Sequence, residues 1–160
     1  MLVALSLAGI AEEMSRLEAT MGELAASPLL WLSQPTRHIL SAGGKRLRAA
    51  LVFRAGQLGG RGSVDVLVHA AVAVELIHAA SLVHDDLIDQ SPHRRGRPTI
   101  HEKWHHDAAV LSGDYLFALA AQAIARTGDI RVLEQVARRR WPSAKGRSAR
   151  WTRWSRWKRP

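Results

Sequence analysis

The sequence is defined first by what it lacks. None of its 160 residues is cysteine, which excludes a disulfide framework and thiolate metal sites and fits a reducing, cytoplasmic setting. No apolar run approaches the roughly 18–20 residues that a membrane-spanning helix needs. The N-terminal MLVALSLAGI has no basic flank, so we interpret it as the start of an amphipathic helix and not as a signal peptide. No internal repeat is present.

Alternation of apolar and polar residues, the mark of a half-buried strand, is also absent, so we expect an all-α fold. Apolar residues instead recur at spacings of three, four or five along most of the chain. We expect Pro35 to interrupt the second helix and the fifth to break near His106 and Asp107. Helices are predicted over residues 2–25, 28–40, 45–58, 64–89 and 101–126, with a further one from Ile130.

Acidic residues are missing from the end of the chain. Residues 1–137 carry 13 basic and 14 acidic side chains, whereas residues 138–160 carry 10 basic side chains, no acidic one and four of the six tryptophans. We therefore predict a domain over 1–137 and a disordered Arg/Trp-rich tail over 138–160. The tail is either the product of a shifted reading frame or a real basic segment that contacts nucleic acid or an acidic membrane surface.

Three carboxylates cluster at the end of the predicted helix 64–89. Asp85, Asp86 and Asp89 are three and four residues apart and share one region of the helix surface. Their charges repel one another and oppose the helix dipole, so a compensating cation is favoured, and magnesium prefers such oxygen ligands. The alternative is an ordinary solvated helix end.

Two basic clusters accompany these carboxylates. Arg94, Arg95 and Arg97 follow the turn Ser91-Pro92, which can fold them back toward the aspartates. Arginine forks suit phosphate oxygens, although simple Asp–Arg pairing across the turn is the alternative.

The second basic cluster is Gly43-Gly44-Lys45-Arg46-Leu47-Arg48, where Lys45 and Arg48 share one face of a helix start that favours anions. An ordinary basic helix start is the alternative. His78 lies two helical turns before Asp85 on the same face, so it can point into the same cavity.

His101-Glu102-Lys103-Trp104-His105 fits the HExxH zinc pattern. Against a zinc protease, His106 is not at the spacing of a third ligand. We interpret His101 and His105 as a solvated or substrate-side pair.

Four stretches in this order resemble the trans-type polyprenyl diphosphate synthases of the long-chain kind. They are GGKRLR, ELIHAASLVHDDLID, RRGRPTIH and SGDYLFALAAQ, and the similarity runs from about Pro28 to about Ala137. The resemblance implies an isoprenoid-synthase helical bundle of which this chain holds only the N-terminal half. It also implies a prenyltransferase that condenses isopentenyl diphosphate with an allylic diphosphate, as a homodimer in the full-length family.

The same resemblance implies the site residues. Asp85, Asp86 and Asp89 would hold Mg²⁺ on the allylic diphosphate, which Arg94 would also contact. The diphosphate of isopentenyl diphosphate would be held by Lys45, Arg48, His78 and Arg95. Small residues one turn before the first aspartate, Ala80 and Ser81, imply a long prenyl product.

The family's second aspartate-rich motif is absent from these 160 residues. We therefore expect a truncated chain that is poorly soluble or oligomeric, with little or no catalysis alone. The alternative is a non-catalytic subunit or fragment that associates with a complete synthase. Specific nucleic-acid binding is not expected, whereas weak contact with a membrane surface stays open.

Overall fold

The computed structural model describes residues 9–60 and 62–138. The chain divides into two compact units, Met1–Gly128 and Asp129–Pro160, and the second contains a helix over residues 130–138. The predicted disorder of the tail concerns residues that, beyond Arg138, lie outside this description. The first unit contains α2 (Ala11–Leu24), α3 (Leu30–Ser41), α4 (Leu47–Gly59), α5 (Val64–Ile88), α6 (Ile100–Trp104) and α7 (His106–Arg126).

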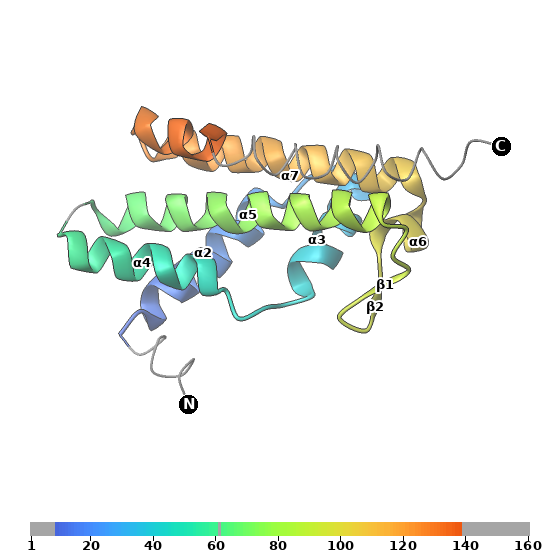
Figure 1. Ribbon diagram of the computed structural model, residues 1–160, viewed down its shortest axis with the longest axis horizontal. Helices are drawn as coiled ribbons and strands as arrows, with labels where there is room; N and C mark the ends of the chain where they lie inside the picture. The colour runs from blue at the N-terminus through green and yellow to red at the C-terminus, as the bar shows by residue number, and fades with distance from the viewer. Residues whose placement is uncertain (1–8, 61, 139–160) are drawn as a thin grey trace. The chain divides into compact units, whose positions relative to one another are not determined.

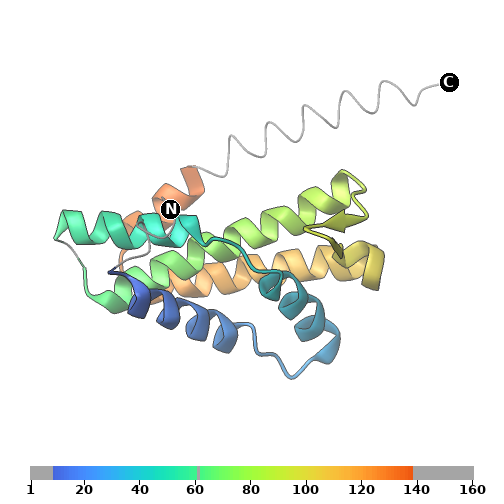
Figure 2. The same ribbon diagram turned by 90° about the horizontal axis from the view of Figure 1, so that it is seen from below.

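The all-α prediction is confirmed, with one small exception between α5 and α6. There β1 (His93–Arg94) pairs antiparallel with β2 (Arg97–Pro98). Figure 1 shows α5 and α7 side by side along most of their length, with the hairpin at the end where α5 stops. α2 and α4 pack against α5, and α3 and α6 pack against α7, as the view from below shows (Figure 2).

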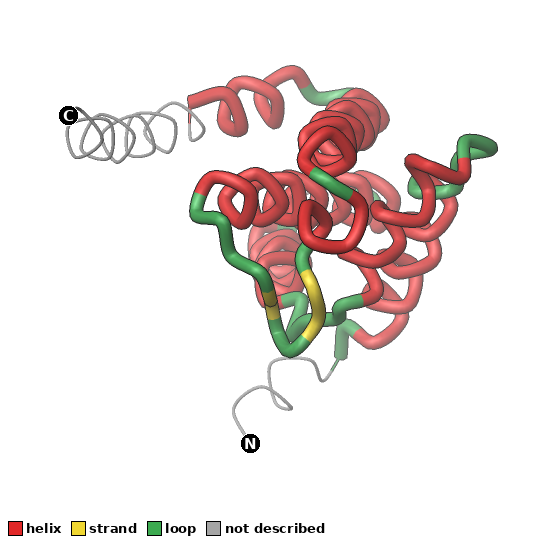
Figure 3. The backbone as a smooth tube through the Cα atoms, turned by 90° about the vertical axis from the view of Figure 1, so that its right-hand side faces the viewer, coloured by secondary structure: helices red, strands yellow, loops and turns green. Residues whose placement is uncertain are grey.

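α5 is the central helix because it is apolar on most sides and begins at a capped position. Ser63 stands at its N-cap, where the Val66 N–H donates to the Ser63 hydroxyl oxygen at 3.4 Å. Its buried side chains are mainly alanine, valine and leucine, and no glycine or proline interrupts them. Figure 3 shows the short hairpin of β1 and β2 in yellow beside the red helices.

By length and composition alone, α5 and α7 could each cross a bilayer, contrary to the expectation from the sequence. About half of the most apolar stretch of each helix, 50% in α5 and 44% in α7, is buried within the chain itself. Core helices of soluble proteins pass the same test, so this finding is weak evidence for a membrane span.

The contact between α5 and α7 depends on a glycine. Gly113 on α7 faces the imidazole of His84 on α5 so closely that a Cβ atom at residue 113 would overlap the ring. The His84 Nε2 lies 3.3 Å from the Val110 carbonyl oxygen and 3.5 Å from the Asp114 carboxylate. The ring also packs against Phe117, so this histidine joins the two central helices.

The predicted interruption of α3 at Pro35 is wrong, whereas the predicted break near His106 is confirmed one residue earlier. α3 continues through Pro35, because the lost backbone hydrogen bond is confined to one carbonyl and the proline ring is buried. The hydroxyl of the next residue, Thr36, donates to the Leu32 carbonyl at 2.8 Å. The break between α6 and α7 falls at His105, whose φ of 77° no helix accommodates.

We expect Gly113→Ala to destabilise the fold by about 1–3 kcal/mol, because the added methyl group must displace the His84 ring from between two packed helices. Gly22→Ala on α2 is the matched control, since nothing lies within 4 Å of its new Cβ. That change should stabilise by about 0.5–1 kcal/mol through helix propensity. Urea unfolding followed by circular dichroism measures both; equal stabilisation by the two changes would contradict the packing role of Gly113.

Candidate functional site

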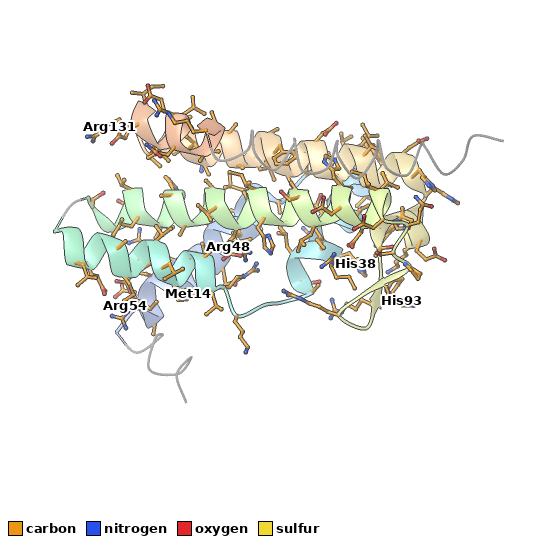
Figure 4. All side chains as sticks on the ribbon, in the orientation of Figure 1. Met14, His38, Arg48, Arg54, His93 and Arg131 are labelled. Carbon is orange, nitrogen blue, oxygen red and sulfur yellow. The ribbon has the colours of Figure 1, made fainter. Side chains whose placement is uncertain are left out.

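A cavity of about 500 Å³ lies where the α3–α4 loop, the start of α4, the middle of α5 and the hairpin meet. Its lining includes all five side chains that the sequence analysis assigned to substrate diphosphates: Lys45, Arg48, His78, Arg94 and Arg95. Figure 4 shows Arg48 at the end of α4 that follows the loop from α3. Residues up to 50 positions apart in the sequence thus share one concave and strongly basic surface.

The loop before α4 approaches the hairpin because it contains two glycines. Gly43 has a φ of 66°, and the Arg95 guanidinium donates to its carbonyl oxygen. A Cβ on Gly44 would lie 2.9 Å from an Arg95 nitrogen, closer than real Cβ atoms approach a neighbour. The missing side chains therefore let Arg95 close one side of the cavity.

The hairpin reverses direction at Arg95 and Gly96, whose φ values are 52° and 75°. Two successive positive φ angles are typical of the tight turns that join antiparallel strands. The sequence predicted that the turn Ser91-Pro92 folds the arginines back toward the aspartates, and Arg94 does reach Asp86. Ser91-Pro92 lies at the base of the hairpin, where the Thr99 hydroxyl donates to the Ser91 carbonyl at 2.8 Å. On the far side, the His38 Nε2 of α3 donates to the Pro98 carbonyl at 2.8 Å.

Arg94 is bound to Asp86 in the structure. Its Nε lies 2.8 and 2.7 Å from the two carboxylate oxygens, and its Nη2 lies 2.6 Å from one of them. Asp86 is only 4% exposed, and the hydrogen bonds that its carboxylate accepts from Arg94 are the main reason why the pKa of Arg94 is raised. The pairing between aspartate and arginine that the sequence left as an alternative is therefore present here.

The three aspartates do not converge. Among the residues that the structure describes, no three His, Cys, Asp or Glu side chains are grouped so as to hold a metal ion. Asp86 is turned to the hairpin, whereas Asp89 caps the end of α5 in an exposed position. The donor set still suits a hard cation, because Asp85 and Asp89 are carboxylates four residues apart.

The zinc interpretation of the HExxH stretch gains no support. His101 is buried, with its Nδ1 3.2 Å from the Thr99 hydroxyl and its ring 5.7 Å from that of His106. His105 is exposed and breaks the helix, so the two imidazoles do not share one continuous helical face. The predicted solvated pair is therefore wrong for His101, which is buried, whereas His105 and His106 are exposed.

His78 reports the electrostatics of the cavity. Burial lowers its pKa most, and the positive charge of Arg48 lowers it further, with smaller effects in the same direction from Arg95 and Arg94. Glu75 acts in the opposite direction. Burial disfavours any charge at this position, whereas the three arginines create a positive potential that favours an anion.

Two cavity residues were missed by the sequence analysis. Glu75 is 5% exposed, and its carboxylate lies 3.7 Å from the Arg46 guanidinium. A glutamate in the middle of a buried apolar helix was the available signal, since buried charges need partners.

The two residues assigned to product length are separated by the structure. Ala80 is fully buried, whereas Ser81 lies on the half-buried face of α5 that carries His78 and Asp85. Neither lines the 500 Å³ cavity. Their role stays a prediction.

Known proteins similar to this chain share its sequence and its fold. The heptaprenyl diphosphate synthase component 2 of Geobacillus stearothermophilus is 42% identical over 133 residues, which cover 82% of this chain and 39% of that relative. A decaprenyl diphosphate synthase structure from Rhodobacter capsulatus superposes with a TM-score of 0.80 at 41% identity and covers 85% of this chain and 42% of that one. A polyprenyl synthase from Caulobacter crescentus, complexed with calcium and isoprenyl diphosphate, gives a TM-score of 0.81 at 33% identity. The match covers 85% of this chain and 41% of that one.

The chain thus spans about two fifths of the length of these relatives. The model of the polyprenyl synthetase family matches residues 30–149, which extends past the boundary predicted at residue 137. The order of the four motifs, the helical fold and this match agree, and the chain therefore belongs to the polyprenyl synthetase family.

Proposed function

We propose that this chain binds the diphosphate group of isopentenyl diphosphate in the 500 Å³ cavity, as the N-terminal half of a prenyltransferase site. The observation that carries the proposal is the meeting of five basic side chains from the α3–α4 loop, α4, α5 and the hairpin around one hollow. Lys45, Arg48, His78 and Arg95 surround the diphosphate of isopentenyl diphosphate. Charge-assisted hydrogen bonds from such groups are among the strongest that proteins make to phosphate.

The reaction proposed for the complete site joins this substrate to an allylic diphosphate. The allylic C–O bond breaks, the diphosphate leaves with the electron pair, and the double bond of isopentenyl diphosphate forms the new C–C bond. A proton then leaves the condensed product to restore a double bond. Arg94 faces the leaving diphosphate, where positive charge stabilises the negative charge that develops on the departing oxygens.

Asp85 and Asp89, together with Asp86 if Arg94 releases it, would hold Mg²⁺, which supplies positive charge to the oxygens of the allylic diphosphate. Ser81 lies one turn before Asp85, on the half-buried face of α5, where a growing prenyl chain would pass. Its small side chain leaves room for a long product. Ala80 is enclosed by its neighbours, so Ser81 is the residue of the two that can meet that chain directly.

A second candidate is a non-catalytic subunit or fragment that associates with a complete synthase. The relative from Geobacillus stearothermophilus is named as one component of a heptaprenyl diphosphate synthase, which favours an assembly of more than one chain. Large apolar side chains on one stripe of α4 are also exposed, namely Leu47, Leu51 and Leu58. Such a stripe suits a contact with another helix.

Titration calorimetry with isopentenyl diphosphate tests the binding proposal on the 160-residue chain. We expect saturable binding of one ligand, and no binding at millimolar ligand would reject the proposal. A parallel incubation with an allylic diphosphate, labelled isopentenyl diphosphate and Mg²⁺ measures condensation. Activity that appears only when a complete synthase is added and co-elutes with the chain would favour the second candidate.

Arg48→Gln should weaken the binding of isopentenyl diphosphate by about 10- to 100-fold, because a charge-assisted hydrogen bond is lost in a partly enclosed cavity. Arg54→Gln is the matched control, since Arg54 is on the same helix but is not part of the cavity lining. Calorimetry should show a change of less than about twofold for this control. Equal effects of the two substitutions would mean that only net charge matters.

The imidazole of His78 should titrate below its usual pKa of 6.5 in the free chain, because burial and Arg48 both lower its pKa. A bound diphosphate raises that pKa, so protonation of His78 and ligand binding favour each other. Affinity should therefore increase as the pH falls below the pKa of the bound form. NMR of the His78 ring with and without ligand checks both shifts.

Since the ligand also titrates, the same pH series on His78→Gln serves as the reference. The difference between the two series isolates the contribution of the imidazole. If this difference is flat between pH 5 and pH 8, His78 does not contact the diphosphate.

A further inference from the structure

Glu75 is a charged residue in an otherwise apolar stretch of α5. Its side chain is 5% exposed, and an ionised group at that depth is costly unless it is paired and hydrogen-bonded. The Ala49 N–H donates to its Oε1 at 3.1 Å, and the Arg46 Nη1 lies 3.7 Å from its Oε2. Both partners belong to the beginning of α4, so the carboxylate connects α5 to the basic turn.

The beginning of α4 has no cap of its own. Arg46 occupies the N-cap position, and its side chain has no oxygen that could accept a hydrogen bond from the first helical N–H groups. Ala49 is the third residue of the helix, and its N–H is one of those that an N-cap side chain normally satisfies. Glu75 supplies the missing acceptor from a different helix, with a negative charge that complements the helix dipole.

Arg46 is held inward by several acceptors. Its φ is 43°, in the left-handed region that favours glycine, and its side chain is only 12% exposed. Besides Glu75, its guanidinium reaches the Glu18 carboxylate at 2.7 and 3.2 Å and the Leu40 carbonyl at 3.3 Å. The positive charge of Arg46 is therefore compensated within the fold.

The neighbours of Arg46 in the sequence are arranged differently. Lys45 and Arg48 are exposed and line the cavity, as does His78, one helical turn beyond Glu75. Because the Arg46 side chain is turned inward, Lys45 and Arg48 on either side of it are left for the ligand.

We propose that Glu75 is a positioning residue for diphosphate binding. Its carboxylate caps α4 and holds Arg46 inward, and this arrangement presents Lys45 and Arg48 to the cavity. The inference rests on the proposed diphosphate site. Glu75 acts on the ligand indirectly, through the basic side chains that it positions, because its own carboxylate would repel an anion.

The direction in which Glu75→Gln changes the affinity for an anion distinguishes a positioning role from simple charge repulsion. Removing a carboxylate from the lining of an anion site should strengthen anion binding if only charge matters. Under the positioning role, Glu75→Gln weakens the binding of inorganic pyrophosphate about threefold, because the amide oxygen still caps α4 but no longer attracts Arg46. Glu75→Ala loses both interactions and weakens binding about tenfold or more.

The measurement is calorimetric titration of the 160-residue chain with inorganic pyrophosphate without added metal, with folding checked by circular dichroism. Glu23→Gln, an exposed change of equal charge on α2, is the control and should alter affinity by less than about twofold. Arg46→Met and the double variant Arg46→Met/Glu75→Gln complete a cycle. If Glu75 acts through Arg46, the double variant binds no more weakly than Arg46→Met alone.

Each outcome of these titrations supports or overturns one part of the proposal. Tighter or unchanged pyrophosphate binding by Glu75→Gln overturns the positioning role while leaving the diphosphate site intact. Additive losses in the cycle overturn the route through Arg46. No binding of pyrophosphate by the unaltered chain rejects the diphosphate site itself, and the positioning role with it.

Discussion

The packing of α5 against α7 is the contact on which the rest of the structure depends. It buries the most apolar helix of the chain along its length and gives α2, α3, α4 and α6 a surface to pack against. The close approach at Gly113 and His84 determines how these two helices meet. Because α5 also carries Glu75, His78 and the aspartates, its orientation in the bundle decides which of these side chains face the cavity.

The cavity brings together cationic groups from three segments, and these groups repel one another. The fold reduces this repulsion by pairing some of the cations internally. Asp86 binds Arg94, and Glu75 and Glu18 bind Arg46, so that much of the charge is compensated before any ligand arrives. Burial lowers the pKa of His78 most, and the positive charges of Arg48, Arg95 and Arg94 lower it further, so a positive field still acts on this part of the cavity. An anion is the natural complement of that field.

Much of this was predictable from the sequence, because helical periodicity and short-range spacing determine which residues share a face. The helices and the N-cap at Ser63 required only such local rules. The predicted meeting of His78 and Asp85 in one cavity is not seen, since His78 lines the 500 Å³ cavity and Asp85 does not. Helical phase could also have separated Ser81 from Ala80, since only Ser81 lies on the stripe of His78. The capping of α4 by Glu75 was not predictable in this way, because it joins residues 26 positions apart whose distance depends on tertiary packing. Pro35 also shows that tertiary packing can override local rules. Local propensity predicted an interruption of α3 at this residue, but packing kept the helix intact.

Binding and chemistry make different demands on the fold, and this chain meets them unequally. A diphosphate needs donors, and the described donors come from the α3–α4 loop, α4, α5 and one hairpin. An allylic cation needs walls that exclude water, and the face of α5 with His78, Ser81 and Asp85 is only half buried within the described residues. Solvent at that face would capture the cation before a second substrate could. The donors of the proposed diphosphate site are therefore present in the described residues, whereas the proposed condensation would need further walls along α5.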